Sequence, residues 1–213
     1  DEARGKILFG DPVCYGTAMM RRSIVEEHHL RCDEAWLYPG MDYLFLVALS
    51  RHARFANIME ALTQYRTGEQ NMRHGRDPLT DRARTYRGLF RLLGIEASEE
   101  ELRCQLMLHR MFPRVPSSAE VKALRAWVDT LKHMNRERLL FPVAPFEMEI
   151  DRRWDNLFHP LADLSIGAAI THMRLACGWR MSHLRYLASS AWTRSRNGGR
   201  RTTASLEPLR TGS

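Results

Sequence analysis

The chain has 213 residues, 44% of them apolar and 27% charged, and this ordinary globular composition excludes a disordered or fibrous protein. The formal net charge of +7 is uneven: residues 180–213 carry seven arginines and one glutamate, whereas residues 1–179 are nearly neutral, which argues against a nucleic-acid-binding surface on the folded part. The longest apolar run, residues 43–49, is far shorter than the roughly 20 residues of a membrane-spanning helix.

Residues 1–75 mix strand-like and helical patterns. Three segments are predicted to be short strands: residues 16–20, 54–58 and 62–65. A short helix is expected up to about His29, and a second helix over residues 41–52 is apolar nearly all round, which predicts that it is buried. Asp42 lies in the first turn of that second helix, where the helix dipole favours a carboxylate.

Residues 76–192 are predicted to be almost wholly helical. Gly94 would end a helix over residues 79–93, and Ser98 and Ser117 each open a capping box, with a glutamate three residues later, before an apolar-periodic run. Further helices are expected over residues 146–158 and 164–192. Residues 193–213 are polar and basic, which predicts a disordered tail.

The four cysteines form no C-x-x-C pair, which is typical of reduced thiols in a cytoplasmic protein rather than of disulfides or zinc ligands. The nearest approach to a metal-binding pattern is His28-His29 with Asp33 beyond. Adjacent histidines point in different directions on a helix, so no metal site is predicted there.

Short motifs in residues 11–75 occur in a characteristic order. They are Thr17-Ala-Met-Met-Arg-Arg-Ser23, Asp33-Glu34, Gly40-Met41-Asp42-Tyr43, Phe55-Ala-Asn-Ile58, and Tyr65-Arg66 followed by Asn71. In order and spacing this stretch resembles the back half of a family 2 glycosyltransferase, a class whose nucleotide-diphospho-sugar-binding fold is called GT-A. The helical remainder resembles the C-terminal extension of some bacterial members, through residues 98–102, residues 108–110 and the spacing of Trp127, Leu131 and Asn135.

The resemblance implies transfer of a sugar from a nucleotide diphosphate to an acceptor hydroxyl, in the synthesis of cell-surface polysaccharide or lipopolysaccharide. Asp42 matches the general base of the family, and a carboxylate at the start of a buried helix can face a cleft and reach an incoming hydroxyl. The implied substrate-binding residues are Arg66, which would reach the diphosphate, Trp36, which would stack on the acceptor, and Tyr65, Arg21 and Asp33. A divalent cation, Mn²⁺ or Mg²⁺, would neutralise the leaving diphosphate in the complete enzyme.

The chain departs from the family pattern at Met41, where the family has Glu, and at Gly68, where it has His. The donor-binding half and its metal-binding Asp-x-Asp lie upstream in the family and do not fit into the 41 residues before Asp42. The prediction is therefore a fragment that is inactive alone and binds no metal. It would have an α/β part over residues 1–75 (a partial GT-A fold), a helical region over residues 76–192 and a tail, and be predominantly helical overall. An apolar face is expected where the missing sheet would pack.

Two other functions fit the sequence. Residues 76–192 could form a helical, non-catalytic module that binds a partner. Alternatively, residues 166–213 could bind an anionic membrane at the inner face of the plasma membrane, because an apolar-periodic helix there carries Arg174, Arg180 and Arg185 and leads into the basic tail.

Overall fold

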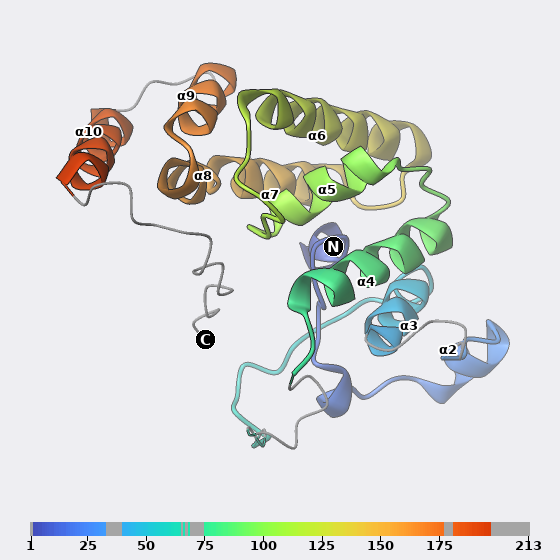
Figure 1. Ribbon diagram of the computed structural model, residues 1–213. Helices are drawn as coiled ribbons and strands as arrows, with labels where there is room; N and C mark the ends of the chain where they lie inside the picture. Colours follow the sequence, from blue (N-terminus) through green and yellow to red (C-terminus); the bar gives the residue numbers. More distant parts are fainter. Residues whose placement is uncertain are drawn as a thin grey trace. The chain divides into compact units, whose positions relative to one another are not determined.

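The computed structural model describes residues 2–32, 40–64, 66, 68, 75–176 and 181–196, with side chains described up to residue 189 (Figure 1). Its elements are helical: α1 (Glu2–Lys6), the 3-10 turn η1 (Tyr15–Thr17), α2 (Arg22–Glu27), α3 (Met41–Leu49), α4 (Pro78–Leu93), α5 (Glu99–Leu108), α6 (Ser118–Arg138), α7 (Val143–Asp155), α8 (Phe158–Leu164), α9 (Ile166–Leu175) and α10 (Met181–Arg196). They form two compact units. The first comprises Asp1–Ala97 with Met134–Glu149, and the second Ser98–His133 with Ile150–Ser213.

The predicted α/β character of residues 1–75 is wrong, because the described part of this region contains helices and irregular segments but no strand. Residues 54–58 and 62–64 are irregular, and Tyr65 lies outside the described residues. Residues 16 and 17 belong to η1, Ala18 is extended at φ −73° and ψ 134°, and residues 19 and 20 have no regular secondary structure. An isolated extended segment leaves its ladder hydrogen bonds unmade, so β-propensity without a neighbouring strand does not give a sheet.

The first unit is built around α3 and α4. Six of the nine residues of α3 are buried, as the apolar run predicts. Gly88 of α4 lies so close to α3 that a Cβ there would come within 2.9 Å of Leu44 Cδ1. A second part of the core joins the end of α1 to the start of α7, where the Phe9 and Phe146 rings stack with centroids 6.0 Å apart.

The second unit packs α5 and α6 with the C-terminal part of α7 and with α8, α9 and α10. Gln105 and Trp127, both buried, join α5 to α6 through a hydrogen bond of 2.9 Å from the indole Nε1 to Oε1. The last helix packs on α8, where the rings of Phe158 and His183 stack 3.9 Å apart. Tyr186 donates a hydrogen bond of 2.7 Å to Asp163.

The helix signals of the sequence locate most helices correctly. Ser98 and Ser117 form their capping boxes, and Gly94 ends α4 in the left-handed conformation at φ +62°. The single helix expected over residues 164–192 is instead divided into α9 and α10, and α1 and α8 were not predicted. Of the predicted tail, residues 193–196 are the end of α10 and residues 197–213 lie outside the described residues. Among the helices described, none has the length and apolar character needed to cross a lipid bilayer.

Candidate functional site

The start of α3 is fixed in place by a glycine. Gly40, the residue before the helix, has φ +112° and packs against α4. A Cβ at this position would lie 2.6 Å from Thr85 Oγ1, and Thr85 is itself buried and bonded by that hydroxyl to the Asp81 carbonyl at 2.9 Å. Glycine therefore allows both the backbone conformation and the close approach of α3 to α4.

Asp42 stands in the first turn of α3, two residues after this glycine. Its side chain is half-buried, and Oδ1 accepts a hydrogen bond of 2.8 Å from the Tyr43 amide. Tyr43 is buried and donates its hydroxyl proton to the Ile7 carbonyl, which fixes the next residue of the helix to the core. The carboxylate thus sits on a rigid element, near the positive end of a helix dipole.

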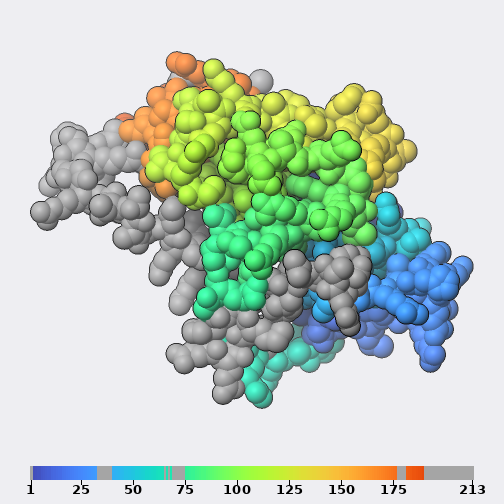
Figure 2. All heavy atoms as spheres, turned by 45° about the vertical axis from the view of Figure 1, so that its right-hand side comes forward, coloured from blue at the N-terminus to red at the C-terminus, as the bar shows by residue number. Residues whose placement is uncertain are grey.

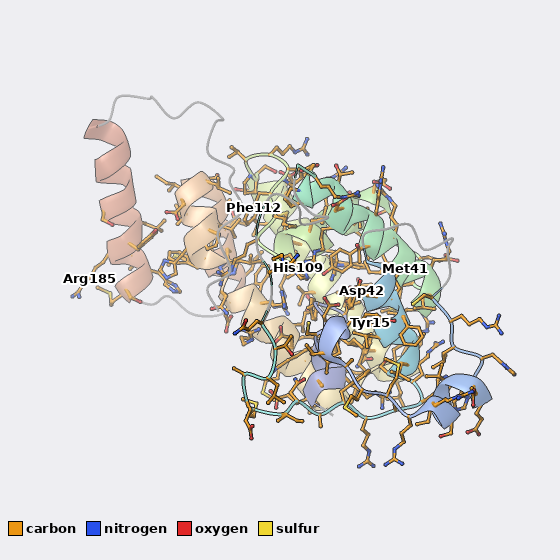
Figure 3. The ribbon with its side chains drawn as sticks, turned by 90° about the horizontal axis from the view of Figure 1, so that it is seen from below. Tyr15, Met41, Asp42, His109, Phe112 and Arg185 are labelled. Carbon is orange, nitrogen blue, oxygen red and sulfur yellow. The ribbon has the colours of Figure 1, made fainter. Side chains whose placement is uncertain are left out.

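Tyr15 and Cys32 lie at the same end of α3. The Tyr15 hydroxyl is 3.8 Å from Cys32 Sγ, and its ring packs edge-on against Phe45 with centroids 6.0 Å apart. Figure 3 shows Tyr15 and Asp42 close together at the start of the helix. The Cys32 contact, partial burial and the negative charge of Asp42 raise the pKa of Tyr15 above its ordinary value of 10. A phenol is protonated at neutral pH with or without this shift, so the Tyr15 hydroxyl can donate a hydrogen bond.

An apolar cluster holds these groups around α3. Its buried members are Phe45, Leu46 and Leu49. The partly buried side chains packed on them come from the segments before and after α3: Val13, Ile24, Val25, Leu30, Cys32, Ala53 and Phe55. Cys32 reaches α3 as a member of this cluster, and Tyr15 reaches it through its contacts with Phe45 and Cys32.

The predicted site residues fall into two groups. Asp42, Arg21 and Arg66 are described, and both arginines are exposed. Neither arginine makes a hydrogen bond or an ion pair with Asp42 within the described part of the chain. Asp33, Trp36 and Tyr65 lie outside the described residues.

Sequence reasoning did not assign Tyr15 or Cys32 to the site. No spacing rule links either residue to Asp42, so the signal lies only in the tertiary packing of the apolar cluster on α3. Together with Asp42 they place a proton acceptor and a proton donor at one end of a buried helix, an arrangement suited to binding a hydroxyl compound.

A divalent cation would need several ligand side chains close together among the described residues. No group of three or more His, Cys, Asp or Glu side chains there could hold a metal ion. The residues described therefore do not fit the divalent cation that the glycosyltransferase resemblance implies.

A second polar group is buried in the other unit. His172 donates a hydrogen bond of 2.9 Å from Nε2 to the Trp154 carbonyl, and the two rings lie 4.4 Å apart. Its Nδ1 is buried without a hydrogen-bond partner, and burial lowers the pKa of the imidazole. The Arg125 guanidinium lies 5.4 Å from the centre of the Trp154 ring. This packing gives His172 a structural role as a neutral core residue.

Comparison with protein-family models, with curated proteins and with solved structures finds no match to this chain. The function of the chain is therefore to be inferred from its sequence motifs and from the geometry around Asp42.

Proposed function

We propose that the chain carries the acceptor side of a glycosyltransferase, with Asp42 as its general base, in the synthesis of a bacterial cell-surface polysaccharide or lipopolysaccharide. The observation that supports this most strongly is the position of Asp42: it is half-buried in the first turn of a buried helix whose start Gly40 locks against α4. The type of reaction, sugar transfer, is proposed from the resemblance of the ordered motifs of residues 11–75 to family 2 glycosyltransferases.

In the proposed reaction, the acceptor hydroxyl gives its proton to the Asp42 carboxylate. The acceptor oxygen then forms a bond to the anomeric carbon of the donor sugar, and the bond to the nucleoside diphosphate breaks with the electron pair leaving on the diphosphate. Tyr15, kept protonated, would donate a hydrogen bond to an oxygen of the acceptor. Arg66 is the exposed cation assigned to the diphosphate, and Arg21, also exposed, is a further substrate-binding residue. No step is assigned to a metal ion.

The test uses the product of the longest reading frame that contains this sequence, assayed with UDP- and GDP-sugars and with a glycan or lipid extract as acceptor. The expected result is acceptor-dependent release of nucleoside diphosphate. Replacing Asp42 by Asn should lower kcat about 10²–10⁴-fold, the usual contribution of a general base, and leave the KM for the donor nearly unchanged.

The matched control is Asp129→Asn. Asp129 is an exposed acid of α6 that pairs with Arg125, and its loss should leave turnover unchanged. The proposal fails if no donor supports diphosphate release, or if the Asp42 and Asp129 variants have equal kcat.

The alternative is a non-catalytic helical module that binds a partner. The observation in its favour is that the described residues are helical and contain no sheet on which a nucleotide sugar would bind. Failure of every donor in the assay above, with a chain that remains folded, is the result that would favour this module.

A further inference from the structure

The segment that follows α3 exposes large apolar side chains. Residues 53–64 have no regular secondary structure, and Figure 1 shows them as a coil that leaves the end of α3. Ile58 is 70% exposed, Met59 93% and Leu62 66%. In a folded protein such a concentration of exposed apolar side chains on one loop indicates an interaction site.

The loop is held at its base and is therefore presented in a defined place. Phe55 packs into the apolar cluster on α3, and the Ala53 amide donates to the Leu49 carbonyl at 3.0 Å. Asn57 Nδ2 donates a hydrogen bond of 3.1 Å to the Pro12 carbonyl. The three exposed apolar residues follow directly after this anchored base, and Figure 2 shows teal atoms of the segment at the lower edge of the surface.

The flanks of the loop are basic. Arg51, Arg54 and Arg66 are all exposed, and within residues 51–66 they are opposed by a single acid, Glu60. The segment therefore has a net charge of +2 around an apolar tip. Apolar side chains that enter the headgroup layer, flanked by arginines that contact anionic headgroups, are the chemistry of interfacial membrane binding.

We propose that the loop of residues 51–66 binds the surface of an anionic lipid membrane, with Ile58, Met59 and Leu62 entering the headgroup region. Charge complementarity and the small size of the tip favour this partner over a protein. The tip has three apolar side chains, whereas a stable protein–protein interface uses roughly 20–30 residues a side. The apolar tip takes no part in the proposed transferase activity and Asp42 is not used, whereas Arg66 is also the residue proposed to contact the diphosphate.

The test is co-sedimentation of the full chain with two kinds of vesicle, phosphatidylcholine alone and phosphatidylcholine with phosphatidylglycerol. Binding is expected only to the anionic vesicles and should weaken as salt is raised. Joint replacement of Ile58, Met59 and Leu62 by Ser should weaken binding at least tenfold. Replacement of Arg51, Arg54 and Arg66 by Gln should weaken it about fivefold per arginine.

A matched control separates the loop from general surface effects. Met148, 67% exposed on α7, is replaced by Ser, and the exposed Arg103 of α5 is replaced by Gln. This double variant should bind the vesicles like the unmodified chain. Far-ultraviolet circular dichroism should show that every variant keeps its helical content, because the substituted side chains are exposed.

Three outcomes would overturn the proposal. One is equal binding, or no binding, to the two kinds of vesicle. Another is binding that survives the loop substitutions but is lost when Arg200 and Arg201 of the C-terminal tail become Gln, which would place the lipid contact there. The third is self-association in sedimentation velocity that the serine variant abolishes without vesicle binding, which would make the loop a protein interface.

Discussion

Replacing Gly40 by Ala tests whether close packing of α3 on α4 fixes the position of Asp42. Two separate costs follow from the structure. A non-glycine residue at φ +112° is strained by about 1–2 kcal/mol, and the new Cβ, 2.6 Å from Thr85 Oγ1 and 3.0 Å from its Cγ2, adds roughly 1–2 kcal/mol of overpacking. The free energy of unfolding should therefore fall by about 2–4 kcal/mol.

A double-mutant cycle separates the two costs. Thr85→Ala removes both of the closest atoms, so the Gly40 substitution made in that background should recover about 1–2 kcal/mol, while the backbone strain remains. Gly16→Ala is the control, because no atom lies within 4 Å of a Cβ there and the free energy should change by less than about 0.5 kcal/mol.

Urea unfolding followed by circular dichroism at 222 nm measures all four variants, and a loss of 2–4 kcal/mol corresponds to a midpoint lowered by about 1 M or more. A loss below about 1 kcal/mol at Gly40, or purely additive effects of the Gly40 and Thr85 substitutions, would refute the packing account.

Three further predictions concern the rest of the chain. Burial lowers the pKa of His172 below its unfolded value of 6.5, so the unfolded chain binds the proton more readily than the folded chain. The free energy of unfolding should therefore fall as the pH drops below about 6.5. In urea titrations at several pH values, His172→Gln should flatten this dependence, whereas the control His133→Gln should not. Arg138 donates hydrogen bonds to the carbonyls of Leu93, the last residue of α4, and of Gly94 after it, at 2.8 and 2.9 Å. Arg138→Ala should therefore lower the unfolding free energy by about 1–2 kcal/mol, and Arg138→Lys should restore less than half of the loss, as urea unfolding would show. Burial raises the pKa of Cys104 to about 12, so at pH 8 a thiol reagent should label exposed Cys14 and leave Cys104 unmodified until urea is added, as peptide mass spectrometry would show.

Local signals in the sequence predict the helices well, because a helix is stabilised by contacts within a few residues. The capping boxes at Ser98 and Ser117 and the stop at Gly94 are formed as predicted. The break at Ser165 was missed although its signal is local: the residue is extended at φ −151°, ends α8 and caps α9 by accepting the Ala168 amide. The apolar periodicity of residues 164–192 indicated one continuous helix, and the signal at Ser165 was therefore overlooked.

Strands depend on partners that local sequence does not contain. Residues 16–20 and 54–58 have the composition of strands, but their β-propensity reflects packing in a sheet, and the described part of the chain provides no neighbouring strand. Some of their apolar side chains are exposed, with Met19 at 98% and Ile58 at 70%, whereas Phe55 packs in the apolar cluster on α3.

Of the residues that form the candidate site, the sequence predicted Asp42 but not Tyr15 or Cys32. Asp42 was identified from its motif and from its place at the start of an apolar helix. Tyr15 and Cys32 reach α3 only through non-local packing, because Cys32 belongs to the apolar cluster on this helix and Tyr15 contacts Cys32 and Phe45.

The most direct test of the central claim is the turnover of the Asp42→Asn variant in the product of the longest reading frame containing this sequence, at saturating donor and acceptor. If Asp42 is the general base, kcat falls about 10²–10⁴-fold, while the Asp129→Asn variant keeps full turnover. A kcat for Asp42→Asn within twofold of the unmodified enzyme would contradict the assignment and place the base elsewhere.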